Sequence, residues 1–124
     1  MKYVDSNILI YAFADVSARG EACRSILNEH LATSTLTIDE VVYKIRKKSL
    51  DLALAAVAAI ENAPRLELVP FVEADLPQFR EFLKKGMQPR DSIHALTAMK
   101  SGCTVIYSED KDFDALEIPR KTPW

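Results

Sequence analysis

Five acidic side chains stand where a predicted strand ends or a predicted helix begins. Asp5 follows the first predicted strand, Glu40 lies in the first turn of a predicted helix, and Asp91 opens a later helix. Asp110 and Asp112 follow the last predicted strand. In a parallel sheet, strand ends and the following helix starts share one edge, so we expect these carboxylates to converge. Grouped carboxylates repel, and a divalent cation that prefers oxygen ligands, Mg²⁺ in particular, removes that repulsion.

Each of these acids also has a purely structural interpretation. Asp5 can cap the helix that follows it, Glu40 fits the glutamate position of a capping box, and Asp91 can stabilise a helix dipole. The acids of the 110–114 segment can form a solvated turn, and for Asp114 that interpretation is preferred. Independent caps need not all fall at one edge of a sheet, so the joint pattern favours a site.

Other polar residues near the acids give weaker signals. His94 lies three residues after Asp91 and shares its helix face, but a packed or surface histidine is the favoured interpretation. Ser6, Asn7 and Ser108 stand beside acids and can orient ligands or water, with capping as an equal alternative. The two histidines and two distant cysteines lack zinc-site spacing, and no phosphate-binding glycine loop is present.

One basic cluster stands out, and it begins one turn after Glu40 on the same predicted helix. Such a run of basic residues is usually a solvated helix face. Beside an anionic metal site, however, the same residues can bind a phosphate backbone. Lys84, Lys85 and Arg90 can add to it if the fold brings them near. The cluster consists of Lys44, Arg46, Lys47 and Lys48.

The composition is that of a folded protein without bulk positive charge. The chain has 124 residues, of which 48% are hydrophobic and 27% charged, with a formal net charge of −2. We expect one domain over residues 1–124, because domains commonly contain about 100–200 residues. Cys23 and Cys103 are expected to be reduced thiols. No apolar run is long enough to span a membrane, and Asp5 interrupts any signal-peptide core, so a cytoplasmic location is expected.

Predicted strands and helices alternate along the chain. This alternation predicts an α/β fold with a mainly parallel sheet. The helix near residue 37 is expected to start with a capping box at 37–40, and Phe79 and Phe82 are expected to be core or a dimer surface. The strands are expected at 3–4, 31–36, 66–69 and 104–107, and the helices at 8–14, 17–30, 37–48, 51–63, 73–85 and 89–101.

Three segments together resemble the PIN domain, a fold of small metal-dependent ribonucleases that includes the VapC-type toxins of toxin–antitoxin pairs. "YVDSNILIYAF" is similar to the opening strand, first acid and short helix of that family, and "TSTLTIDEVVYKI" resembles the segment with the second acid. "PRDSIHALTAMKSGCTVIYSEDKDFDAL" resembles the third acid, a small-residue helix, a strand and a Ser/Thr-x-Asp-x-Asp-Phe turn. The resemblance covers essentially the whole chain.

The resemblance implies a three-layer α/β/α sandwich with about five strands and a specific set of site residues. It places the catalytic acids at Asp5, Glu40, Asp91 and Asp110, with Asp112 as an alternative or additional acid. Three of them, Asp5, Asp91 and Asp110, would hold Mg²⁺ or Mn²⁺. Ser108 matches the Ser/Thr of the family's turn.

The resemblance also implies an activity and partners. The activity would be hydrolysis of RNA phosphodiester bonds, with Lys44, Arg46, Lys47 and Lys48 as candidate RNA contacts. The partners would be a second copy of the chain and a small antitoxin, without a membrane. A processing nuclease with one dedicated RNA and a non-catalytic PIN-like binding module are the alternatives. A phospho-accepting receiver domain is disfavoured, because the predicted strand at 66–69 ends in Pro70 with no aspartate.

Overall fold

The computed structural model describes residues 1–124, and its centre is a single parallel sheet. The strand order is β3-β2-β1-β4-β5, and each neighbouring pair is parallel, which confirms the predicted α/β class. The first strand of the chain is therefore the middle strand of the sheet. The strands are β1 (Lys2–Val4), β2 (Leu31–Ser34), β3 (Leu66–Val69), β4 (Ile106–Tyr107) and β5 (Arg120–Lys121).

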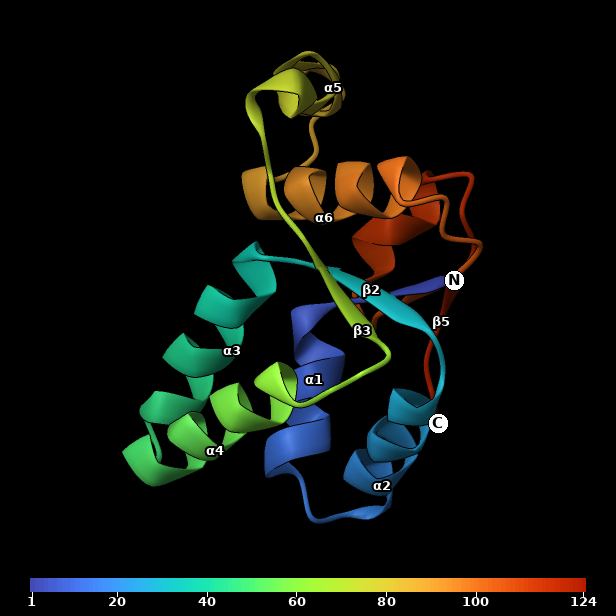
Figure 1. Ribbon diagram of the computed structural model, residues 1–124. Helices are drawn as coiled ribbons and strands as arrows, with labels where there is room; N and C mark the ends of the chain where they lie inside the picture. The colour runs from blue at the N-terminus through green and yellow to red at the C-terminus, as the bar shows by residue number, and fades with distance from the viewer.

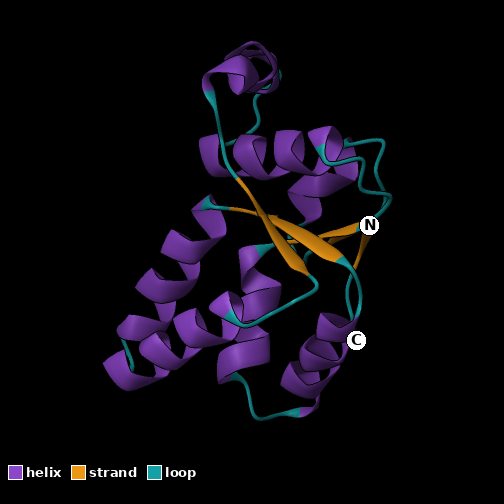
Figure 2. Cartoon of the chain, in the orientation of Figure 1, coloured by secondary structure: helices purple, strands orange, loops and turns teal.

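Helices cover both faces of the sheet and make the three layers that were expected. α1 to α4 lie on one side, and α5 and α6 lie on the other (Figures 1 and 2). Three short 3₁₀ segments complete the fold. The helices are α1 (Ser6–Ala14), α2 (Ala18–Ser25), α3 (Leu36–Arg46), α4 (Leu50–Glu61), α5 (Leu76–Lys84) and α6 (Pro89–Lys100), and the 3₁₀ segments are η1 (Ile26–Asn28), η2 (Glu73–Asp75) and η3 (Lys111–Ala115).

The alternation of side chains along β1 divides the core in two. Tyr3 packs into the cluster on the α5 and α6 side, with Phe82 and Leu96, while Val4 packs into the cluster on the α1 to α4 side. Successive strand residues point to opposite faces, so a three-residue strand is enough to join both layers. Phe82 is only 6% exposed, and Phe79 packs against the same cluster. Of the two roles expected for these rings, core or dimer surface, both rings therefore have the core role.

Local signals explain where several helices begin and end. The Ser49 side chain accepts a hydrogen bond from the Leu52 amide and caps α4, and Pro89 is the first residue of α6. Gly86 and Gly102, which follow α5 and α6, have φ angles of 90° and 68°. Only glycine adopts these angles without strain, so both helices end where the sequence predicts a stop.

The predicted capping box at 37–40 is wrong. The helix α3 already begins at Leu36, and Thr35, its N-cap residue, makes no side-chain capping bond. The Thr37 hydroxyl instead lies 2.6 Å from the Thr33 hydroxyl, which itself donates to the Val4 carbonyl. Glu40 is consequently the fifth residue of α3, beyond its first turn, and its carboxylate is free to reach across the molecule.

Other element boundaries also differ from the prediction. The strand expected at 104–107 is regular only at 106–107, and β5 was not predicted because two residues carry no periodic signal. The helix expected at 17–30 changes to a 3₁₀ turn after Ser25, and the one expected at 73–85 begins as η2. Both cysteines are free and buried, and none of the helices combines the length and hydrophobicity that a membrane span requires.

Candidate active site

The predicted acids gather at the carboxyl edge of the sheet, in the position that the parallel topology requires. Asp5 directly follows β1, and Asp110 stands two residues beyond Ser108, which follows the neighbouring strand β4. Glu40 comes from α3 and Asp91 from the first turn of α6. Strand ends and helices that are far apart in the chain therefore bring these carboxylates into two adjacent groups.

Asp5 is held by Ser6, Asn7 and Ser108, the three short polar residues that stand beside acids in the sequence. One carboxylate oxygen accepts from the Ser6 amide at 2.7 Å, and the other accepts from the Ser108 hydroxyl at 2.7 Å and from the Asn7 side-chain amide at 3.2 Å. Asp5 is only 5% exposed. It therefore both caps α1 and presents to the site a carboxylate that three hydrogen bonds hold in place.

His94 joins Asp5 and Glu40 into the first group. Its Nε2 atom lies 2.6 Å from a Glu40 carboxylate oxygen and 3.5 Å from Asp5. On the other side of the ring, Nδ1 lies 2.6 Å from the Tyr3 hydroxyl, which also accepts a hydrogen bond from the Ser34 amide. The ring is 2% exposed, so the imidazole is fixed between a tyrosine and two carboxylates.

The electrostatics of this group favour a charged pair. Burial acts against the imidazolium, but the Glu40 hydrogen bond and the charges of Asp5, Glu40 and Asp91 outweigh it, so the pKa of His94 is raised. Burial likewise opposes the Glu40 carboxylate, yet the His94 hydrogen bond and charge lower the pKa of Glu40. The favoured interpretation of His94 as a merely packed residue was therefore incomplete. Its position three residues after Asp91 was the available signal.

The second group consists of Asp91, Asp110 and Asp112, whose nearest carboxylate oxygens all lie within 4.8 Å of one another. Burial, followed by the charges of Asp110, Asp5 and Asp112, raises the pKa of Asp91 to about 6. The Asp110 side chain accepts a hydrogen bond from the Asp112 amide at 2.9 Å, which caps η3 and fixes the turn. Three carboxylates converge here.

This second group has the composition of a site for a hard divalent cation. No Lys, Arg or His forms an ion pair with Asp91, Asp110 or Asp112, whereas Asp114 pairs with Arg120 at 2.8 Å and so lies outside the group, as preferred from the sequence. Oxygen ligands with unrelieved mutual repulsion fit Mg²⁺ or Mn²⁺. The predicted metal set Asp5, Asp91 and Asp110 is divided between the two groups, and the effect of Asp5 on the Asp91 pKa links them.

A groove of about 650 Å³ extends from the first group along α3. Glu40 lines it together with the exposed side chains of Tyr43, Lys44 and Lys47, and Arg90 adds a cation from α6. Tyr43, Lys44 and the C-cap residue Lys47 follow Glu40 at three, four and seven positions, which is one face of a helix. Of the predicted basic cluster, Arg46 and Lys48 do not line the groove, nor do Lys84 and Lys85.

Comparisons with known proteins agree on one family. A model described as PIN domain matches residues 2–119. Ribonuclease VapC1 of Aquifex aeolicus (strain VF5) is 28% identical over 125 residues, which cover 94% of this chain and 85% of that protein.

Solved structures have the same fold at lower sequence identity. The toxin VapC20 of Mycobacterium tuberculosis, described as cleaving the sarcin-ricin loop, superposes with a TM-score of 0.79 at 18% identity, covering 95% of this chain and 96% of that one. A toxin–antitoxin complex from Klebsiella pneumoniae has a TM-score of 0.78 at 17% identity, covering 100% and 98%. These likenesses support the fold described above.

Proposed function

Since the chain belongs to the PIN domain family, we propose that it is a metal-dependent endoribonuclease and the toxin of a toxin–antitoxin pair. The observation that carries this proposal is the convergence of Asp91, Asp110 and Asp112, without any cationic partner, beside the buried Asp5–His94–Glu40 group. The proposed catalytic acids are Asp5, Glu40, Asp91 and Asp110, with Asp112 as an additional acid.

The proposed cofactor is Mg²⁺ or Mn²⁺, held by Asp91 and Asp110 with help from Asp112 or Asp5. Such an ion supplies an activated water and neutralises charge on the phosphoryl group that is attacked. The protein contributes a rigid setting for these ligands. Ser6, Asn7 and Ser108 fix the Asp5 carboxylate, and His94 fixes Glu40, so neither acid must reorganise when the substrate arrives.

The proposed substrate is RNA, bound along the groove beside α3. Lys44, Lys47 and Arg90 line that groove and would contact phosphates, and Tyr43 offers an aromatic ring that is 56% exposed. Arg46 and Lys48 would act only through their general charge. Single-stranded or looped RNA suits such a groove, because unpaired strands expose both backbone and bases.

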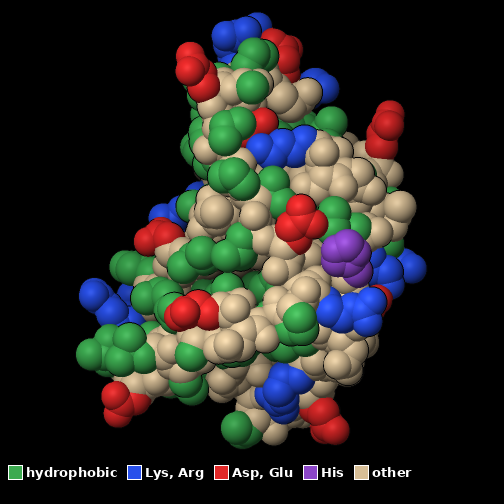
Figure 3. All heavy atoms as spheres, in the orientation of Figure 1, with side chains coloured by type: hydrophobic (Ala, Val, Ile, Leu, Met, Phe, Trp, Pro, Cys, Tyr) green, Lys and Arg blue, Asp and Glu red, His purple; other side chains and the backbone are tan.

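The proposed protein partners are a small antitoxin and a second copy of the chain. The toxin–antitoxin complex from Klebsiella pneumoniae shares this fold, which supports an antitoxin partner. Hydrophobic side chains gather over α3 and α4 on the face seen in Figure 3. In α4, Leu50 and Leu54 are 58% and 59% exposed. Such a face suits a protein contact. We further propose that residues 1–124 form one domain acting in the cytoplasm.

RNA cleavage with and without a chelator tests the activity. The purified chain, freed of any co-purified protein, is incubated with mixed RNA in Mg²⁺ or Mn²⁺, and in EDTA. We expect cleavage only with the metal, and its loss in Asp110→Asn. The matched control is Asp114→Asn, which removes a nearby carboxylate that pairs with Arg120, and this variant should cleave normally. A folded chain that cuts no RNA, or that cuts equally in EDTA, would contradict the proposal.

A further inference from the structure

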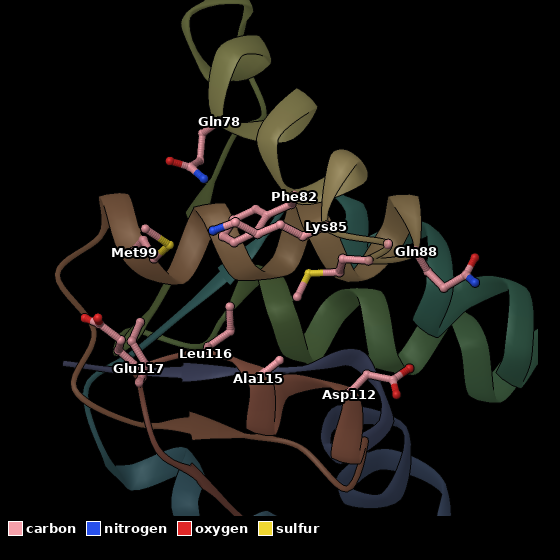
Figure 4. A pocket seen from close by; sticks show the side chains of 12 residues that line it. Gln78, Phe82, Lys85, Gln88, Met99, Asp112, Ala115, Leu116 and Glu117 are labelled. Carbon is pink, nitrogen blue, oxygen red and sulfur yellow. The ribbon is translucent and has the colours of Figure 1, made fainter.

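A second cleft, of about 820 Å³, meets the acids at Asp112, whereas the α3 groove meets them at Glu40. It lies between the turn joining α5 to α6 and the segment 112–118 (Figure 4). We propose that this cleft binds an unpaired nucleobase of the RNA, next to the phosphodiester that is cut. This inference rests on the proposed ribonuclease function and deepens it, because it assigns a subsite that selects the substrate.

The cleft is continuous with the acidic site. Asp112 belongs to the acidic group and also lines the cleft, and Gln88, the N-cap residue of α6, stands three positions before Asp91. Figure 4 shows Gln88 and Asp112 at one end of the cleft, with Met99 and Glu117 at the other. A strand whose phosphate lies at the acids would therefore bring the adjoining nucleotide to the mouth of this cleft.

The lining suits a flat, uncharged ring better than a phosphate. Half of the twelve lining residues are hydrophobic, among them Phe82, Met99 and Leu116. The only cation is Lys85, and it is outnumbered by Asp112 and Glu117, so a second phosphate inside the cleft would meet net negative charge. Binding sites for small organic groups combine such an apolar lining with a few polar atoms, in volumes of about 300–1,000 Å³.

Two glutamine side chains supply those polar atoms. Gln78 and Gln88 line the cleft, and within the chain Gln88 contributes only its backbone carbonyl to hydrogen bonds, with the Ser92 hydroxyl and amide. The amide group of glutamine both donates and accepts, which is the capacity that recognition of a base edge requires. A phosphate offers only acceptor oxygens, and a hydrocarbon side chain of a protein partner offers neither donors nor acceptors. The combined lining and continuity with the acids therefore favour a base.

Titration with nucleosides tests the subsite without any need for catalysis. The ¹⁵N-labelled chain is titrated in EDTA with adenosine, guanosine, cytidine and uridine separately, and with inorganic phosphate. We expect at least one nucleoside to shift the amide resonances of residues 85–88 and 115–118, and phosphate to leave them unchanged. Met99→Trp, which fills the cleft from α6, should abolish the shifts. Leu83→Trp is the control, because Leu83 is 39% exposed on α5 and does not line the cleft.

Cleavage of modified RNA gives a second, kinetic test. A series of oligonucleotides of one sequence, each lacking a single base, is cleaved by the wild-type chain. One position adjacent to the cut should raise KM about tenfold, as expected for losing the contacts of one base. In Met99→Trp the intact RNA should show the same rise in KM, with no further rise when that base is missing.

Several outcomes would overturn the subsite, and they differ from failure of the nuclease proposal. The inference fails if no nucleoside shifts the cleft resonances, if Met99→Trp retains the shifts, or if removing bases near the cut leaves KM unchanged. Shifts that appear only with an added protein partner would assign the cleft to that partner instead. A chain that cleaves no RNA contradicts the proposed activity, while the nucleoside titration still decides whether the cleft binds bases.

Discussion

Glu40 and His94 lie 54 positions apart in the chain, yet a 2.6 Å hydrogen bond joins them at the centre of the candidate site. The bond couples α3 to α6 across the end of the sheet, and Tyr3 of β1 holds the opposite nitrogen of the ring. Three elements thus fix one imidazole. This arrangement explains why an acid beyond the first turn of its helix still reaches the other carboxylates.

Replacing His94 with leucine should destabilise the protein strongly. The change leaves the Glu40 carboxylate without its partner in a site where the side chain is 14% exposed, and breaking a buried pair commonly costs about 3–5 kcal/mol of unfolding free energy. Urea denaturation followed by circular dichroism measures the loss. His30→Leu is the control, because His30 is an exposed histidine 3.9 Å from Glu67 and should change stability by less than about 0.5 kcal/mol. Equal effects of the two variants would refute the structural role.

Replacing Asp91 with asparagine should abolish RNA cleavage but stabilise the fold. Burial and the three neighbouring aspartates make the ionised Asp91 carboxylate unfavourable. In EDTA at pH 7.5, removing this charge should therefore raise the unfolding free energy. We expect a gain of about 1 kcal/mol, because solvent screens part of the repulsion. Thermal denaturation in EDTA measures this gain. Asp114→Asn should do the opposite and lower stability slightly, because it removes the partner of Arg120. A lower denaturation temperature for Asp91→Asn than for the wild type would contradict net repulsion at Asp91.

Stability without metal should fall as the pH rises through about 6. The pKa of Asp91 is raised from 3.8 to about 6, so the folded chain holds this proton more tightly than the unfolded chain does. Its stabilising contribution is therefore complete below pH 3.8 and is lost as pH passes through about 6. Denaturation in EDTA between pH 5 and 7.5 should show this slope in the wild type, in addition to any contribution of His94, and a smaller one in Asp91→Asn.

Mg²⁺ binding should have the opposite pH dependence. The cation requires the ionised carboxylate, so its affinity should weaken as the pH falls below about 6, where a proton occupies Asp91. Calorimetry at pH 5.5 and 7.5, in buffers with different ionisation enthalpies, measures both the affinity and the protons released. Affinity that does not change between these pH values would exclude Asp91 as a ligand.

The lysines of the α3 groove should contribute to RNA binding more than their neighbours in sequence. Lys44→Ala and Lys47→Ala should each weaken binding and reduce the slope of log K against log salt by about 0.7, the value for one phosphate contact on a single strand. Fluorescence anisotropy with a short labelled RNA in EDTA separates binding from cleavage. Arg46→Ala and Lys48→Ala carry the same charge change outside the groove. If all four variants behaved alike, the groove would have no special role.

The sequence predicted the fold class because the strand and helix signals are strong where burial is complete. The first strand, the helix that starts at Pro89 and the glycine stops at 86 and 102 were all located correctly. Short elements escaped prediction. The two residues of β5 follow β4 only through tertiary pairing, which no local pattern encodes.

The candidate site was predictable in its acids but not in its connections. Asp5, Asp91 and Asp110 were placed at one sheet edge by topology alone, whereas the division into two groups depends on side-chain directions. The Thr37 hydroxyl, which was expected to cap the helix, forms a hydrogen bond with the Thr33 hydroxyl instead. The Thr33–Thr37 bond joins β2 to α3 across a turn. The sequence favoured a packed or surface role for His94, because most single histidines on a helix have no part in a site. Only the positions of Tyr3 and Glu40 distinguish among these roles.

The central position of β1 also sets the order in which the molecule can assemble. Asp5 is fixed by Ser108, 103 positions later, and β1 has no partner on one side until β4 has been synthesised. Contacts of such high contact order form late, after the loop between them has closed. Asp5 follows β1 and Asp110 follows β4, so their carboxylates come together only when these two strands pair, and no single segment of the chain can form the site.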